Sequence, residues 1–197
     1  MIVNRRDKFA IFLPFKNYSN SLIDFFITDC RLLCYTRYIG NTPHYSWETA
    51  LYSNAHTCVC PEFIMNEGWK RYLPIRNPYD RVISQWKWHL QRGDDQPEFE
   101  DWLMLHSKQA VSMPVTKVYS NYTDIIKCEN IKNEIFNNDL MPIGPDREKQ
   151  ILLFPHSNKS KIKKPPMQLT RRQQEIIYYF HYEDFLVGGY SKTYNPS

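Results

Sequence analysis

Four short apolar runs have the length and composition of buried strands. They are KFAIFLPF at residues 8–15, CYTRYI at 34–39, KRYLPIRN at 70–77 and YTDIIKC at 122–128. The first, second and fourth are rich in aromatic or β-branched residues, as strands commonly are. Pro74 in the third run has no N–H to give to a sheet ladder, which predicts an edge strand or an irregular position there.

The strongest helix signal follows the third run. Asn77 is a favoured N-cap residue, Pro78 suits the first helical position, and Asp80 places a negative charge in the first turn. The helix is expected to stop near Gly93. Its buried face is predicted by apolar residues at helical spacing: Val82, Ile83, Trp86 and Leu90.

Weaker signals predict further helices and a last one near the end of the chain. They are expected at residues 21–33, where Ser19 or Asn20 is the cap, at 99–106 and 129–138, and as one or two short helices around 46–52 and 61–67. The last helix begins at Thr170, with Gln173 in the capping-box position, and runs to Gly188-Gly189. Strands that alternate with helices predict a three-layer α/β fold, with a central, mainly parallel sheet flanked by helices, in one domain over residues 1–197.

Composition and charge narrow the function classes only a little. The 197 residues are 42% hydrophobic and 15% aromatic, which is enough for a folded core. The net charge of +4 admits an anionic ligand but is weaker than a nucleic-acid binder usually carries. Neither a signal peptide nor an apolar run of the roughly 18 to 20 residues of a membrane helix is visible. We therefore expect a cytoplasmic protein with no nucleic-acid or membrane partner.

The cysteines give no clear metal pattern. There are five of them: Cys30, Cys34, Cys58, Cys60 and Cys128. Cys58 and Cys60 are too close in sequence for the usual zinc-ligand spacing, so reduced thiols and no metal cofactor are expected. The alternative is a Cys/His site that uses His44 or His56.

The turn after the first strand has features of an anion-binding loop. It begins with Lys16 and continues through Asn17, Tyr18, Ser19, Asn20 and Ser21. N–H groups at a helix start attract anions, and Lys16 adds a positive charge where the strand ends. The loop is not a Walker A sequence, because it contains no glycine. The alternative is a solvated lysine followed by an ordinary capped helix.

The turn after the third strand carries a second set of anion-binding groups. Arg76 can hold a phosphate with its planar guanidinium, and Ser84 lies two helical turns further along. Arg81 can serve the same ligand or pair with a carboxylate. The alternative is that Asp80 and Arg81 form surface ion pairs and that Ser84 is a small packing residue.

These segments together resemble the sulfotransferases that use 3′-phosphoadenosine 5′-phosphosulfate (PAPS). KNYSNSL is similar to the family's 5′-phosphosulfate loop, and IRNPYDRVISQW is similar to its 3′-phosphate motif. Three later segments also resemble family segments in the same order: YTDIIKCENIKNEIF, FPHSNKSKIKK and LTRRQQEIIYYFHYEDFLVGGY. The resemblance is to the carbohydrate-type enzymes, in the short soluble form of bacteria and viruses, and covers nearly the whole chain.

The resemblance implies a P-loop-kinase-like fold and transfer of a sulfuryl group from PAPS to a hydroxyl, with carbohydrate as the expected acceptor. It implies that Lys16 steadies the charge on the leaving oxygen. The residues implied to bind the donor are Lys16, Asn17, Tyr18, Ser19, Asn20 and Ser21 for the 5′-phosphosulfate, and Arg76 and Ser84 for the 3′-phosphate. Tyr18 and Asn20 depart from the small residue and the threonine usual at their positions.

The resemblance also implies a general base and a closing loop. His56 is the expected base for the acceptor hydroxyl, with His44 and Glu48 as alternatives. The closing loop matches Asn158, Ser160 and Lys161. Tyr45 and Trp47 are candidates for contact with the acceptor.

Two other functions remain open from the sequence. One is a nucleotide or small-molecule kinase of related fold, although the missing Walker A pattern argues against it. The other is a catalytically degenerate module that binds a nucleotide or a polyanion, which the departures at Tyr18 and Asn20 favour. The sequence does not indicate an oligomeric state.

Overall fold

The computed structural model describes most of the expected elements. The described residues are 1–4, 7–14, 16–23, 25–26, 62–66, 68–91, 98–106, 113–140 and 168–195. The chain divides into two compact units. The sheet unit comprises residues 1–75 and 121–158, and the helical unit comprises residues 76–120 and 159–197. The single domain expected over 1–197 stays a prediction.

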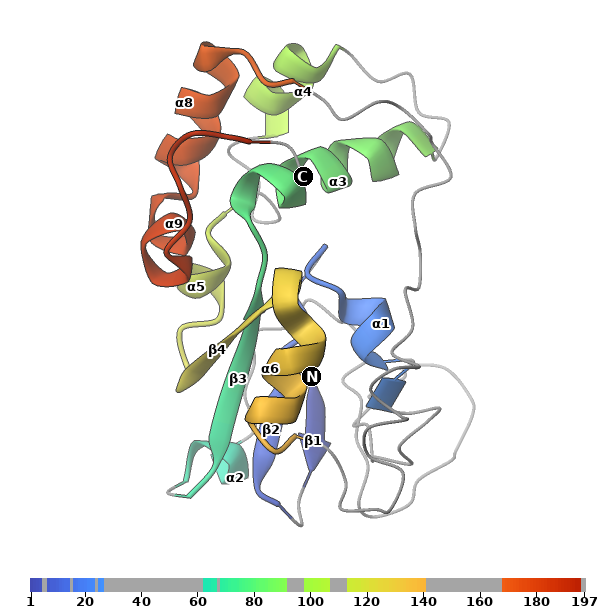
Figure 1. The fold of residues 1–197 in the computed structure, drawn as a ribbon, viewed down its shortest axis with the longest axis vertical. Helices are drawn as coiled ribbons and strands as arrows, with labels where there is room; N and C mark the ends of the chain where they lie inside the picture. Colours follow the sequence, from blue (N-terminus) through green and yellow to red (C-terminus); the bar gives the residue numbers. More distant parts are fainter. Residues whose placement is uncertain are drawn as a thin grey trace. The chain divides into compact units, whose positions relative to one another are not determined.

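The sheet unit is built on a mixed sheet (Figure 1). Its described strands are β1 (Ile2–Asn4), β2 (Phe9–Ile11), β3 (Lys70–Ile75) and β4 (Asp124–Lys127), in that order across the sheet. β2 pairs with β3, and β3 with β4, in parallel; β1 pairs with β2 antiparallel. The α/β character of the fold is therefore confirmed. The sequence did not predict β1, and the strand expected at 34–39 lies outside the described residues.

Of the two alternatives predicted from Pro74, an edge strand or an irregular position, the edge strand is wrong, because β3 lies between β2 and β4. The pairing of β2 with β3 ends at Ile11 and Tyr72, and the N–H of Phe12 still bonds the carbonyl of Tyr72. Alternate residues of a strand turn their peptide groups to the same side, so Pro74 faces the β2 side just beyond the end of that ladder. An interior strand accommodates the proline there because no ladder bond from its nitrogen is needed.

Four short helices lie in the described part of the sheet unit. They are α1 (Ser19–Ile23), α2 (Glu62–Met65), the 3₁₀ turn η3 (Cys128–Asn130) and α6 (Ile131–Asn137). The helices expected at 61–67 and 129–138 are confirmed, whereas the one expected at 46–52 lies outside the described residues. The core of the unit joins strands to helices, and it contains Ile2, Phe9, Ile11, Leu13, Leu22, Phe25, Phe26, Tyr72, Ile126, Ile131, Ile135 and Leu140. This packing fixes the turn between β2 and α1.

The helical unit contains five described helices. They are α3 (Pro78–Gln91), α4 (Phe99–His106), α5 (Val115–Val118), α8 (Arg171–Phe180) and α9 (Tyr182–Gly188). The predicted start of α3 is confirmed, because the side-chain oxygen of Asn77 accepts the N–H of Tyr79 at 3.0 Å. The predicted capping box of Thr170 and Gln173 is also confirmed.

The last predicted helix is wrong in one respect: it is two helices. His181 leaves helical geometry at φ −115° and ψ 22°, so α8 ends before it and α9 begins after it. The imidazole of His181 bonds Arg81 of α3, and this tertiary contact fixes the break. Gly189 ends α9 with φ 60°, a left-handed geometry that glycine adopts without a side-chain clash.

Aromatic residues fill the core of the helical unit, as expected for the tryptophans on its helices. Trp86 and Trp102 are buried, and Trp88 is half-buried. The core contains Tyr79, Val82, Ile83, Trp86, Phe99, Trp102, Leu103, Leu169, Ile177 and Phe185. Within the described part of the chain, no helix is both long and apolar enough to cross a membrane.

Candidate functional site

The first candidate turn has the strand–turn–helix form that the sequence predicts. Lys16 and Tyr18 both have left-handed backbones, with φ of 64° and 59°. A positive φ is uncommon for non-glycine residues and unusual for a bulky one such as tyrosine, and such residues gather at ligand-binding loops. The carbonyl of Tyr18 accepts the N–H of Leu22 at 2.9 Å, so Tyr18 stands at the start of the helix. The caps expected at Ser19 or Asn20 are therefore wrong, since α1 already includes both.

Several side chains of this turn point inward. Asn17 is fully buried, and its amide donates to the carbonyl of Pro74 at 2.8 Å. The hydroxyl of Ser19 donates to the carbonyl of Pro14, and Ser21 is buried as well. An anion bound to the turn in this conformation would therefore meet mainly backbone N–H groups of the helix start and the Lys16 ammonium.

The structure explains why a tyrosine stands at position 18, where the resembled loop has a small residue. Its side chain is half-buried and packs against the core of the sheet unit. The ring is thus part of the hydrophobic core. It contributes apolar burial that offsets the cost of its left-handed backbone.

The second candidate turn links β3 to α3. Arg76 and Ser84 are half-buried, and the carbonyl of Asn77 accepts the N–H of Arg81 at 3.0 Å. Asp80 accepts the hydroxyl of Tyr194 at 2.9 Å. Burial first, and Asp80 second, raise the pKa of Tyr194, whereas the positive charge of Arg76 lowers it. Arg76 therefore lies close enough to this tyrosine to affect its ionisation.

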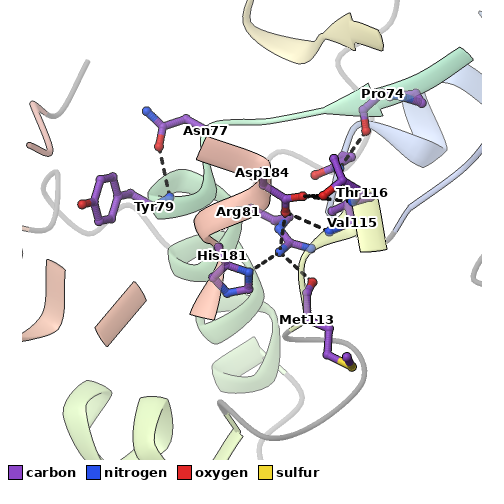
Figure 2. A network of polar contacts seen from close by, with 10 residues as sticks. Pro74, Asn77, Tyr79, Arg81, Met113, Val115, Thr116, His181 and Asp184 are labelled. Atoms are coloured by element: carbon purple, nitrogen blue, oxygen red, sulfur yellow. Dashed lines mark hydrogen bonds and ion pairs between the residues drawn. The ribbon is translucent and has the colours of Figure 1, made fainter. Parts of the chain in front are cut away.

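Arg81 is committed to a buried network inside the helical unit (Figure 2). Its Nη2 lies 3.3 Å from Oδ2 of Asp184 and 2.8 Å from Nδ1 of His181, and it donates to the carbonyl of Met113 at 3.1 Å. Burial lowers the pKa of Arg81, and Asp184 opposes that shift. The surface ion pair considered for Arg81 is thus wrong, and the guanidinium acts as a structural group instead.

Asp184 is the centre of this network, and the sequence did not indicate it. Its carboxylate accepts the backbone N–H groups of Val115 and Thr116 at 2.8 and 3.0 Å, and the hydroxyl of Thr116 at 2.8 Å. One carboxylate therefore caps α5 and neutralises Arg81 of α3. No local pattern encodes this, because Asp184 is 103 positions from Arg81 and 68 from Thr116.

The buried His181 predicts a pH dependence of stability. Burial first, and Arg81 second, lower the pKa of His181 well below its ordinary value. An unfolded chain has a histidine pKa near 6.5, so it takes up the proton at a higher pH than the folded chain. The stability that this residue contributes is therefore present above about pH 6.5 and is lost as the pH falls below it, at up to about 1.4 kcal/mol per pH unit.

Urea denaturation of wild-type protein and of the His181→Asn variant between pH 7.5 and 5 checks this prediction. Asparagine keeps an oxygen acceptor for Arg81 but cannot take up a proton. We expect the variant to lose less stability than the wild type over this range. Equal losses in the two proteins would show that His181 does not titrate on unfolding.

Not every expected site residue lies within the described residues. Those outside are His56, Asn158, Ser160 and Lys161, the alternative bases His44 and Glu48, and the acceptor candidates Tyr45 and Trp47. The ring of His106 stacks on that of Trp102, with 4.9 Å between the ring centroids. Among the described residues, no group of three or more His, Cys, Asp or Glu side chains could hold a metal ion.

A hollow of about 740 Å³ lies in the helical unit. It is lined by Met113, Pro114, Lys117, Glu175, Tyr178, Tyr179, Phe180, Tyr182, Glu183 and Lys192. Lys192 lies 4.9 Å from the ring centre of Tyr178. Of the residues expected to bind the donor, none of those within the described part of the chain lines this hollow.

Comparisons of the chain with protein-family models, curated proteins and solved structures find no match.

Proposed function

We propose that this protein is a sulfotransferase that moves a sulfuryl group from PAPS to an acceptor hydroxyl, with carbohydrate as the acceptor class. One observation carries the proposal. β2 and β3 are parallel neighbours, and each is followed by a turn with a cationic residue and a helix. Lys16 follows β2, and Arg76 follows β3. In open α/β sheets, ligands bind outside the carboxyl ends of the strands.

The reaction assigns different tasks to the two turns. The acceptor oxygen forms a new bond to sulfur, and the bond from sulfur to the bridging oxygen of the 5′-phosphate breaks. The acceptor proton passes to a base, for which His56 is our candidate. Negative charge develops on the bridging oxygen, where the Lys16 ammonium would counter it. Positioning and charge stabilisation dominate such transfers, so two cationic turns that bind the donor would supply much of what the chemistry needs.

The geometry of the first turn supports a phosphate-binding role. Its two left-handed residues bracket Asn17, and left-handed residues occur in the backbone turns that bind anions. The N–H of Asn17 itself donates to the carbonyl of Pro14 at 3.2 Å. Because Asn17 and Ser19 are bonded inside the protein, their side chains define the shape of the turn. Other backbone N–H groups of the turn and the Lys16 ammonium are our candidates for binding the 5′-phosphosulfate.

The second turn supports recognition of the 3′-phosphate. α3 is 14 residues long and well capped, so its N-terminal end carries a partial positive charge. Arg76 stands two residues before this helix, and Ser84 is two turns inside it. A guanidinium and a helix terminus suit a phosphate monoester and would distinguish PAPS from ATP, which has no 3′-phosphate.

Adenosine 3′,5′-bisphosphate, the product nucleotide, should raise the melting temperature of the protein. A ligand that binds only the folded state stabilises it, and a concentration about 100 times the dissociation constant corresponds to roughly 5 to 10 °C for a chain of this size. Differential scanning fluorimetry with ATP and magnesium at equal concentration is the control, and it should give a much smaller shift. No shift with the bisphosphate contradicts the proposal, and a preference for ATP with magnesium favours a kinase.

A second function deserves a test because one observation favours it. The hydroxyl of Ser19 is bonded to Pro14, and Ser21 is buried, so two hydroxyls expected to bind the donor face the protein interior. A turn with fewer donors suits a module that binds the nucleotide without catalysis. Bisphosphate binding, combined with no sulfate transfer from PAPS to a panel of glycans, lipids and small hydroxyl compounds, would select this function.

A further inference from the structure

The side chain of Asn17 joins the first turn to the middle of the sheet. It is fully buried, and its Nδ2 donates to the carbonyl of Pro74 at 2.8 Å across 57 positions of sequence. Asn17 also stands between the left-handed residues Lys16 and Tyr18. A buried hydrogen bond therefore ties the strained part of the turn to β3.

The end of the β2–β3 ladder explains why β3 needs this bond. Ladder pairing ends at Ile11 and Tyr72, so the carbonyl of Pro74 lies beyond the last paired residue on the same side. Pro74 is buried, and a buried carbonyl without a partner is costly. The amide of Asn17 replaces the missing strand and supplies the donor.

The orientation of the amide follows from the same geometry. Oδ1 of Asn17 is buried and has no hydrogen-bond partner among the described residues. Pro74 has no N–H, so β3 offers this oxygen no donor at that residue. A flipped amide would place Oδ1 against the carbonyl of Pro74, oxygen facing oxygen. The tether thus consists of one bond, and only a donor at this position can make it.

We infer that Asn17 is a positioning residue that does not contact the donor. Its bond to Pro74 keeps the turn from Lys16 to Ser21 in the conformation that binds the 5′-phosphosulfate. Pro74 is two residues before Arg76 in the chain, so the same bond anchors the strand that leads to the second turn. This inference rests on the function proposed above. It replaces the expectation that Asn17 itself binds the nucleotide.

The physical effect is preorganisation. Each non-glycine residue held at a positive φ costs on the order of 1 to 3 kcal/mol, so Lys16 and Tyr18 keep this geometry only while the surroundings enforce it. Without the tether the turn relaxes, and binding must restore the geometry. Affinity for the nucleotide then falls although every group that touches it is still present.

The Asn17→Asp variant tests this inference, because aspartate has the shape of asparagine. At pH 8 an ionised carboxylate has no hydrogen to donate to Pro74. We expect calorimetric titration to give an affinity for adenosine 3′,5′-bisphosphate roughly 10- to 100-fold below that of the wild type. At pH 5.5 the buried acid, whose pKa burial raises, is protonated and can donate. The affinity should then return to within about threefold of the wild type at the same pH.

Two further measurements separate positioning from a general structural role. Asn133→Asp makes the same chemical change at an exposed position on α6, and it should leave the affinity unchanged at both pH values. Circular dichroism at pH 8 confirms that the Asn17→Asp protein is folded during the titration. A folded Asn17→Asp protein that binds the bisphosphate as tightly as the wild type at pH 8 overturns the inference and leaves the proposed function standing.

Proton NMR tests the tether without any nucleotide. The side-chain amide signal of Asn17, identified by its loss in Asn17→Asp, should exchange slowly with solvent because the amide is buried and bonded. Backbone amides of the turn should exchange faster in the variant at pH 8 than at pH 5.5, after correction for intrinsic rates. If the wild type binds no bisphosphate, the proposed function fails, and these exchange rates still decide on the tether. Rapid exchange of the Asn17 amide overturns it.

Discussion

The Asp184→Ala variant should lose about 3 to 5 kcal/mol of its free energy of unfolding. Removing one partner of a buried ion pair has this effect because the other charge is left without compensation. Arg81 and Asp184 are both buried, with side-chain exposures of 5% and 1%. For a chain of this size the loss corresponds to a melting temperature lower by roughly 6 to 20 °C, which scanning calorimetry can measure.

Three further contacts add to this loss. The N–H groups of Val115 and Thr116 and the hydroxyl of Thr116 donate to the same carboxylate, and alanine leaves all three donors without it. Each buried donor left unpaired costs about 1 to 3 kcal/mol where water cannot replace the acceptor. The start of α5 should therefore loosen together with the ion pair, and backbone amides there should exchange faster.

A matched control variant and a double variant test whether the lost stability comes from the ion pair of Arg81 and Asp184. Glu183 precedes Asp184 on α9 and is exposed, so Glu183→Ala should change stability by no more than about 0.5 kcal/mol. Arg81→Leu combined with Asp184→Leu removes both charges and should cost less than the sum of the single changes. Additive effects would mean that the two residues do not interact. An Asp184→Ala protein as stable as the wild type would show that this network does not stabilise the fold.

The sequence predicted the elements whose signals are local. The cap of α3 rests on Asn77 and Pro78, and that of α8 rests on Thr170 and Gln173. In each case the residues that specify the helix start are at most three positions from one another. Such signals act through neighbouring backbone groups, so a single sequence contains them in full.

Long-range pairing accounts for most of what the sequence did not predict. Pro74 is acceptable inside the sheet because β2 ends beside it and Asn17, 57 positions away, bonds its carbonyl. The break at His181 depends on Arg81, 100 positions away. No spacing rule connects such residues, and their roles follow only from the fold. For the same reason, the sequence predicted that Asn17 belongs to an anion-binding turn but did not predict what its side chain bonds.

Replacing Lys16 by alanine should reduce sulfate transfer by roughly 100- to 1000-fold, the effect of removing one group that stabilises developing charge in a transition state. The affinity for adenosine 3′,5′-bisphosphate should change by less than about tenfold, since the backbone N–H groups of the turn remain. A group that acts mainly in the transition state lowers kcat more than it weakens ground-state binding. Transfer from labelled PAPS to an acceptor identified in the panel, together with calorimetric titration, measures both quantities.

The effects of Lys16→Ala are compared with those of two other variants, Lys8→Ala and Arg76→Ala. Lys8 is an exposed lysine at the opposite end of β2, and its backbone is also left-handed, with φ 50°. Lys8→Ala therefore repeats the loss of one charge at a positive φ, and it should change neither transfer nor affinity. Arg76→Ala should instead weaken bisphosphate binding roughly 10- to 100-fold, because a guanidinium that grips the 3′-phosphate acts before the transition state. Lys16→Ala could instead reduce the affinity for the bisphosphate as much as Arg76→Ala does and leave kcat unchanged. Lys16 would then act only in binding the nucleotide, and its assignment to the leaving oxygen would be wrong.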